Sequence, residues 1–397
     1  MIGFKEQAIE FAKIFRNEHS NQNLSTGMEI INCNFESHYP FNFTYKGFVK
    51  GDLYYHELVQ GRVDENFKFS YPIVVPDKTK KYNKAIILLH GLNERTWDKY
   101  FVWAKYLAEK TNRPVIMFPI AYHMNRSPKS WSDRRLMSEL SNIRKRSEKD
   151  NNSTFANAAL STRLESHPEL FFYSGLQTCY DIQQLLNEIK RGENNIFTPD
   201  THLDIFAYSI GAFLSQILLL ANPGGMFSTT RLFIFCGGPT FDCMYGNSKY
   251  IMDLRAFKSL LSLKKRKVFR TVKENLMISG DKNIAEAWNG LELMMHRHWR
   301  RKEREAMFNA IGERIKVVAL EKDKVMPVKG IIRAMRGRKN NGLVPVEVID
   351  FPFAYTHEQP FPMGDDKIQG YVDRCFTVVF DKVVNFFNFQ GSEISRN

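Results

Sequence analysis

The stretch LDIFAYSIGAFLSQILLL, residues 203–220, joins two apolar runs through a serine. Residues 203–207 are strand-like, Ser209 stands two positions before Gly211, and an apolar helical segment follows. A sharp strand-to-helix turn would expose the Ser209 hydroxyl at the carboxyl edge of a sheet, with the helix dipole directed at developing negative charge. The pentapeptide alone does not decide between this role and a small residue in a tight connection.

Small side chains flank this serine. Such a turn brings the residues two before and two after the serine close together, and Ala207 and Gly211 meet that steric requirement. Serine is a weak nucleophile that needs a base for its proton and a polar pocket for the oxyanion. We therefore take Ser209 as the candidate nucleophile and look for its partners.

The composition is that of a globular protein. The chain has 397 residues, 43% of them hydrophobic and 25% charged, which allows one large α/β domain with insertions or two ordinary domains. The five cysteines include no CxxC pair, which argues against a disulfide framework or a zinc site. The N-terminus is typical of an amphipathic helix, and no apolar run reaches the ~18 residues of a membrane span, so we expect a cytoplasmic protein without a transmembrane segment.

The net charge of +13 favours anionic partners in principle. The basic excess gathers in four segments, 134–149, 264–273, 296–304 and 336–339, none of which carries the motif of a nucleic-acid module. We interpret these segments as solvated faces of insertions and expect no nucleic-acid partner. Attraction of an anion to the site stays open as the alternative.

Short apolar runs alternate with helical stretches from about residue 85 onward, which indicates a mostly parallel sheet. The expected strands are 85–90, 114–118, 203–208, 231–236, 315–320 and 344–350. The expected helices are 100–111, 175–190, 211–221, 328–337 and 366–388.

Two gaps interrupt this alternation. About 80 residues separate the second of these strands from the third, and about 80 the fourth from the fifth, far more than a crossover requires. We expect insertions at about 124–172 and 241–312 that form a helical cap over the sheet. Residues 1–68 are expected to form an N-terminal helix and edge or flap strands, including 41–59, and residues 69–397 the catalytic domain.

The acid candidate is Asp323, which follows the expected strand 315–320 at the same sheet edge as Ser209. Asp323 could instead cap the helix that begins near residue 327. Glu321 and Asp350 are weaker candidates, because Glu321 lies too early in the strand exit and Asp350 ends the final strand.

The base candidate is His357, the only histidine between Asp323 and the C-terminus. It lies just beyond the final strand in a loop rich in proline and aromatic residues, where it could also be a packed structural residue. As a base, its imidazole would accept the serine proton and deliver it to the leaving group, while the carboxylate fixes the tautomer.

The oxyanion pocket needs two backbone N–H groups. Ile210, next to the nucleophile, would supply one. Gly91, after the first expected strand, allows a tight turn that would direct the N–H of Leu92 at the substrate. His90 is interpreted as structural.

The chain resembles the α/β-hydrolase superfamily of serine esterases, lipases and peptidases. The features that carry this resemblance are, in chain order, "LLHG", "AYSIG", Asp323 and His357. The resemblance covers about residues 69–388. It implies a mainly parallel eight-stranded sheet flanked by helices, a nucleophile elbow and hydrolysis through an acyl-enzyme. Ala207 departs from the pattern, where glycine is commoner. The superfamily also contains lyases, transferases and inactive members, so the fold does not fix the reaction.

The leading functional hypothesis is hydrolysis of a small-molecule carboxylic ester without a cofactor. An inactive hydrolase-like binding protein and a basic nucleic-acid- or anion-binding protein are the alternatives. Basic segments at the mouth would favour an anionic or lipid-like substrate. His296 and His298 lack a third ligand, so no metal is expected. The apolar residues expected near the mouth are Leu92, Trp97, Ile210, Phe241, Met244, Phe351, Phe353 and Tyr355.

Overall fold

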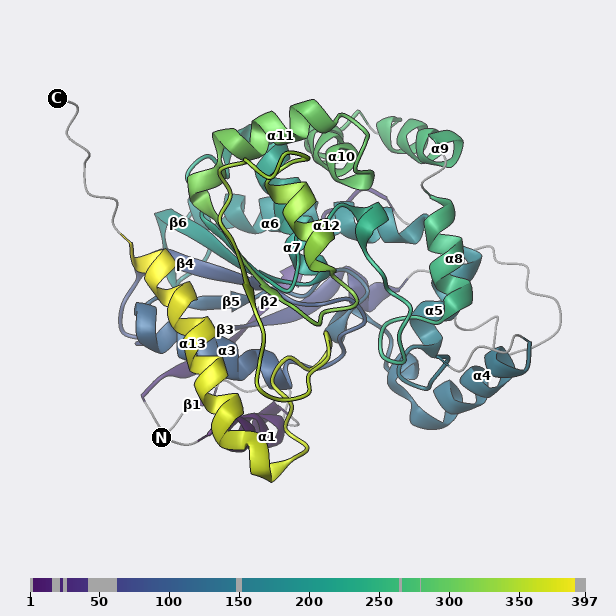
Figure 1. Cartoon of the computed structure of the whole chain (residues 1–397). Coiled ribbons are helices and arrows are strands. Elements are labelled where there is room, and N and C mark those ends of the chain that lie inside the picture. Colours follow the sequence, from purple (N-terminus) through teal and green to yellow (C-terminus); the bar gives the residue numbers. More distant parts are fainter. Residues whose placement is uncertain are drawn as a thin grey trace.

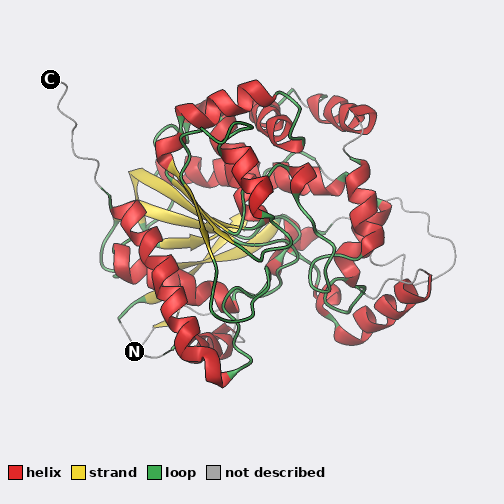
Figure 2. Ribbon diagram, in the orientation of Figure 1, coloured by secondary structure: helices red, strands yellow, loops and turns green. Residues whose placement is uncertain are grey.

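A computed structural model describes residues 3–15, 22–23, 27–41, 63–147, 152–263, 266–278 and 280–389. Helices cover both faces of one central sheet (Figures 1 and 2). Most of the expected flap 41–59 lies outside the described residues. The strands are β1 (Gln22–Asn23), β2 (Glu29–Glu36), β3 (Lys68–Val75), β4 (Tyr82–Leu89), β5 (Val115–Met117), β6 (Phe197–Tyr208), β7 (Leu232–Phe235), β8 (Ile315–Leu320) and β9 (Val346–Ile349).

The sheet order is β1-β2-β3-β5-β4-β6-β7-β8-β9. Apart from the two-residue β1, eight strands form the sheet in the described part of the chain, and β3 alone among them runs against its neighbours. This confirms the expected mainly parallel eight-stranded sheet. All six strands that the alternation predicts are present.

The strands β2 and β3 were not among the predicted strands. Pro72 lies inside β3, and proline is a signal against a strand interior because it lacks an N–H donor. The neighbouring β5 pairs only with Ile73 and Val74, so Pro72 lies beyond the doubly paired part of β3. The strand therefore loses little hydrogen bonding to its proline.

The helices form a layer on each face of the sheet (Figure 2). They are α1 (Phe4–Phe15), α3 (Asp98–Thr111), α4 (Arg134–Ser147), α5 (Ala158–Ser166), α6 (Leu170–Lys190), α7 (Ile210–Ala221), α8 (Leu254–Ser262), α9 (Arg266–Met277), α10 (Lys282–Met295), α11 (Arg301–Ala310), α12 (Val328–Met335) and α13 (Gln369–Asn388). None of the helices in these ranges has the length and apolar character needed to span a bilayer.

Strand β4 shows why its sequence is continuously apolar. Ile86 and Leu88 pack into the cluster formed with α1, α3 and α13, whereas Ala85, Ile87 and Leu89 pack into the cluster on the opposite face. Successive side chains point to opposite faces, and both faces are covered over residues 85–89, so this part of the strand has no polar residue, whereas the exposed start of β4 carries Asn83 and Lys84.

The two insertions are joined to each other. The first contributes α4 and α5, and the second contributes α8 to α11. The Arg144 guanidinium of α4 donates to both carboxylate oxygens of Asp253, at 2.5 and 2.8 Å, and Asp253 caps the start of α8. Arg144 also pairs with Glu165 of α5, so α4, α5 and α8 lie side by side (Figure 1).

Gly290 lets α10 approach α7 closely. A Cβ atom there would lie 2.6 Å from the carbonyl oxygen of Ile217, a distance that backbone atoms cannot accommodate without moving. We expect Gly290→Ala to lower the free energy of unfolding by about 1–3 kcal/mol through overpacking, measured by urea denaturation. The matched control is Gly370→Ala near the start of α13, where a Cβ meets nothing within 4 Å. An equal effect of the two substitutions would contradict the close packing of α10 on α7.

Candidate active site

Ser209 occupies the turn between β6 and α7. Its backbone has φ 57° and ψ −121°, a conformation that is strained for any residue other than glycine. A Cβ atom at Gly211 would lie 2.6 Å from the carbonyl oxygen of Leu89 in β4. The small residue is therefore required by the neighbouring strand, and not only by the approach of Ala207 that the sequence suggested. Ala207 pairs with the same Leu89 in the sheet register.

The predicted partners of Ser209 meet at the carboxyl edge of the sheet. The Ser209 Oγ lies 2.7 Å from His357 Nε2, and His357 Nδ1 lies 2.7 Å from Asp323 Oδ2. All three residues are buried. Because Nδ1–H donates its hydrogen bond to the carboxylate, the lone pair on Nε2 faces the serine hydroxyl.

Asp323 does not cap the helix that follows it. The N-cap of α12 is Pro327, and Asp323 Oδ1 instead accepts the N–H groups of Val325 and Met326, each at 2.9 Å. These bonds hold the second carboxylate oxygen toward His357. The weaker candidate Asp350 is turned elsewhere, to Lys322 and Tyr355.

Tyr208 supports the position of His357. Its ring stacks on the imidazole with centroids 5.4 Å apart and an interplanar angle of 14°, and its hydroxyl donates to the carbonyl oxygen of His357. The tyrosine directly precedes Ser209, so one strand end holds both the nucleophile and the imidazole.

The loop of residues 90–97, here called the HG loop, lies beside the serine. Gly91 N–H donates to the hydroxyl of Tyr100, and Gly211 N–H donates to the carbonyl of His90. Leu92 and Ile210 line the same pocket as Ser209. Ile210 is the first residue of α7, where an N–H has no acceptor within the helix. Their role as oxyanion donors stays a prediction.

Sequence reasoning missed a brace between the HG loop and the loop of residues 350–365, here called the histidine loop. Lys99 of α3 donates to Glu94 Oε1 at 2.5 Å and to the carbonyl of Glu358 at 2.9 Å. The Tyr100 hydroxyl donates to the same Glu94 oxygen. No motif or spacing indicates the contact between the two loops, because Lys99 and Glu358 are 259 positions apart.

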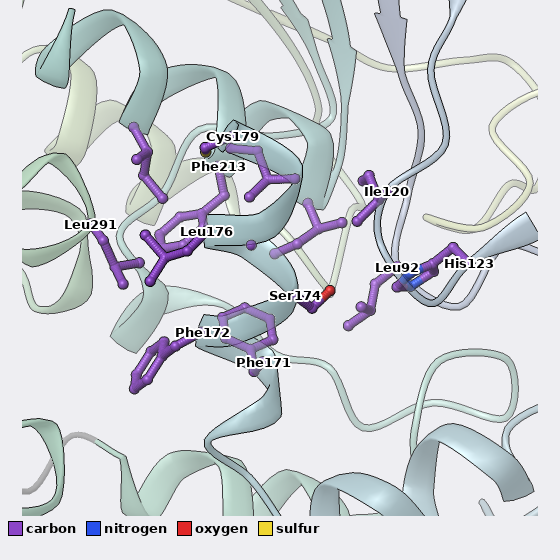
Figure 3. A pocket seen from close by; sticks show the side chains of 14 residues that line it. Leu92, Ile120, His123, Phe171, Phe172, Ser174, Leu176, Cys179, Phe213 and Leu291 are labelled. Carbon is purple, nitrogen blue, oxygen red and sulfur yellow. The ribbon is translucent and has the colours of Figure 1, made fainter. Parts of the chain in front are cut away.

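Two apolar pockets adjoin the serine, each with a volume of about 30 Å³. The first contains Ser209 and is lined mainly by the second insertion, with Phe171, Ile210 and Leu92 as shared walls. The other lies between α6 and α7 (Figure 3), and His123 and Ser174 are its polar side chains. Among the residues that the structure describes, no lysine or arginine lines either pocket.

Four of the eight apolar residues expected near the mouth, Leu92, Ile210, Phe241 and Met244, line the serine pocket. The other four do not: Trp97 packs against His90, and Phe351, Phe353 and Tyr355 pack against one another on the opposite face of the sheet. The pocket is completed by residues that the sequence did not single out, Phe171, Gly246, Ile251, Met252, Phe257, Leu260, Leu261, Val325 and Met326.

His296 and His298 lie in the turn between α10 and α11, not on a helix. His296 faces Asp242, with Nε2 3.5 Å from the carboxylate. Within the part of the chain that the structure describes, no group of three or more potential ligands could hold a metal ion.

The strand order and the turn at Ser209 define an α/β-hydrolase fold. The model of the "Family of unknown function (DUF6051)" matches residues 5–388, so the chain belongs to this family. No curated protein matches the sequence.

Several solved structures are similar to the chain. They include carboxyl esterase 2 from Tuber melanosporum, with 10% identity, 95% of this chain and 97% of that chain covered, and a TM-score of 0.48. The Francisella virulence factor BioJ has 12% identity, 98% and 93% coverage and a TM-score of 0.44. Esterase LipW from Mycobacterium marinum has 12% identity, 97% and 88% coverage and a TM-score of 0.43.

Two buried histidines lie at the HG loop, His90 as its first residue and His123 beside it. The burial of His90 agrees with its interpretation as a structural residue. His90 Nε2 accepts the N–H of Ile120, so Nδ1 donates to the Gly91 carbonyl. Burial lowers the pKa of His90 well below its usual value and that of His123 to about 4. Both rings are therefore neutral at pH 7.

This burial makes stability depend on pH. As the pH falls, His123 takes up a proton near pH 6.5 in the unfolded chain but only near pH 4 in the folded chain. The free energy of unfolding is therefore unaffected by His123 above pH 6.5 and decreases as the pH falls from 6.5 toward 4. We expect wild type to lose about 3 kcal/mol more of its unfolding free energy between pH 7 and pH 4 than His123→Asn, measured by urea denaturation. Identical pH profiles would contradict a neutral buried His123.

Proposed function

We propose that the protein is a serine hydrolase that cleaves a carboxylic ester through an acyl-enzyme on Ser209. The observation that carries this proposal is the continuous hydrogen-bonded chain from Ser209 through His357 to Asp323, with both links at 2.7 Å. The strained backbone of Ser209 supports the same conclusion, because strain of this kind clusters at functional sites.

In the first half of the reaction His357 Nε2 takes the Ser209 proton while Oγ attacks the carbonyl carbon of the ester. The negative charge that develops on the carbonyl oxygen is stabilised by the N–H groups of Leu92 and Ile210. His357 then protonates the leaving alcohol, and Asp323 stabilises the imidazolium.

In the second half a water molecule replaces the alcohol. His357 takes its proton, the acyl carbon accepts the hydroxide oxygen, and Ser209 leaves with the returned proton. Thioester, amide and peptide bonds would be cleaved by the same groups, and no step requires a cofactor.

The lining of the serine pocket favours an uncharged acyl group. Its walls are apolar apart from Ser209, and a buried charge without a partner would cost several kcal/mol. An anionic acyl group is therefore disfavoured despite the net charge of +13. Because the second insertion supplies most of this wall, we assign the two insertions to a cap that encloses the acyl site.

The first test is covalent labelling with a fluorophosphonate. Wild type should be labelled, whereas Ser209→Ala should not, because it lacks the nucleophilic oxygen. The matched control is Ser215→Ala in α7, the helix that follows Ser209. The buried Ser215 hydroxyl donates to the Gly211 carbonyl and should be dispensable for labelling. Labelling of Ser209→Ala at the wild-type level would refute the proposed nucleophile.

The second test concerns the acid. Asp323→Asn presents an amide to His357 Nδ1, so it can no longer fix the tautomer or stabilise the imidazolium, and kcat for p-nitrophenyl acetate should fall about 10⁴-fold. Asp350→Asn removes a carboxylate that pairs with Lys322 and should change kcat less than twofold. Comparable losses in the two variants would contradict the assignment of Asp323.

A further inference from the structure

A wide cleft lies outside the serine pocket. It has a volume of about 630 Å³, within the range of small-molecule sites. The HG loop, the histidine loop, α1, α3 and both insertions contribute residues to its lining. Leu92 lines both the cleft and the pocket that contains Ser209, so the two spaces lie on either side of this residue.

The charges of this cleft are balanced. Arg95, Lys99 and Arg134 line it together with Glu94, Asp98 and Glu358, three cations against three anions. Among the described residues of the four basic segments that account for the excess charge of the chain, only Arg134 lines the cleft. The cleft is therefore suited to a neutral polar group and not to a phosphorylated one.

Two exposed aromatic rings line the cleft, one from each insertion, and the Arg134 guanidinium lies over the Phe155 ring, 5.3 Å from its centroid. Phe155 is 46% exposed and Tyr250 is 53% exposed, although both line the cleft. Large aromatic side chains offer a flat apolar surface and lose little conformational entropy when they bind a ligand. Solvent-exposed aromatic side chains in a cleft therefore indicate a contact surface for a ligand.

Both insertions are held in a fixed relation to the HG loop. The Asn93 side-chain amide donates to the carbonyls of Ala156 and Tyr250, at 2.8 and 2.6 Å, and so ties both insertions to the residue next to Leu92. Ser248 of the second insertion also donates to Glu358 of the histidine loop, at 2.6 Å. A ligand on the two rings would thus be positioned relative to Ser209.

The inner space is much smaller. The serine pocket, at about 30 Å³, has room for only one or two heavy atoms beyond the reacting carbonyl. The site is therefore asymmetric, with a small apolar side and a large polar and aromatic side.

We propose that the substrate is a short-chain ester of a carbohydrate, with the acetyl group in the serine pocket and the sugar in the cleft. A sugar ring has an apolar C–H face, which can pack on Phe155 and Tyr250. Its hydroxyls can form hydrogen bonds with both the cations and the anions that line the cleft. This inference rests on the proposed function. Ser209 Oγ forms a bond to the acetyl carbon, the bond to the sugar oxygen breaks, that oxygen takes the proton from His357, and water then releases acetate.

The experiment compares release of acetate from acetylated xylo-oligosaccharides with hydrolysis of p-nitrophenyl acetate by the full-length protein. Phe155→Ala combined with Tyr250→Ala should raise KM for the oligosaccharide about tenfold, since each ring contact contributes up to about one power of ten in affinity. The same variant should lower kcat/KM for p-nitrophenyl acetate less, because a single ring covers less of the cleft than an oligosaccharide does. The matched control is Tyr371→Ala on α13, which removes an exposed aromatic ring outside the cleft.

Three outcomes would overturn the inference while leaving the proposed hydrolase intact. These are hydrolysis of p-nitrophenyl acetate without release of acetate from the oligosaccharide, an unchanged KM in the double variant, and faster turnover of p-nitrophenyl octanoate than of the acetate. Absence of turnover of every ester together with absence of fluorophosphonate labelling would instead overturn the proposed function itself.

Discussion

The contact between Gly211 and the carbonyl of Leu89 governs the geometry of the site. Helix α7 starts so close to β4 that any side chain at position 211 would collide with the neighbouring strand. The chain can enter the helix there only through a sharp turn, and Ser209 adopts a positive φ to make it. This turn places the Ser209 Oγ at the carboxyl edge of the sheet. The loops after β8 and β9 bring Asp323 and His357 to the same edge.

Burial sets the electrostatic character of this edge. The serine, the imidazole and the carboxylate are nearly inaccessible, and Tyr208, Val325 and Met326 fix their orientation through backbone and ring contacts. The proposed chemistry uses such an environment well, because fixed hydrogen-bond donors act more strongly where water is excluded. The neutral, buried His90 keeps the HG loop in place without adding charge to the site.

The insertions divide the surroundings of the serine into unequal spaces. The second insertion closes an apolar pocket over the nucleophile, and both insertions together frame the larger cleft outside it. Their mutual contacts, led by the Arg144–Asp253 pair, join two segments that lie about a hundred residues apart. Selectivity for a substrate is thus proposed to reside in these insertions, while the sheet supplies the reacting groups.

The sequence by itself predicted the strands β4 to β9, the helices α3, α6, α7, α12 and α13, and Ser209, Asp323 and His357 as candidate site residues. These features are local or follow from chain order, because an apolar run buried on both faces and a residue just after a strand can be recognised in one dimension. Edge strands were expected within residues 1–68, but the ranges of β2 and β3 were not predicted, since β2 mixes polar residues into its run and β3 contains Pro72. Only the tertiary structure decided which residues line the serine pocket, why position 211 must be glycine, and how Lys99 links the two loops. Those contacts join residues far apart in the chain, and their distances depend on the packing of whole elements, which no local pattern encodes.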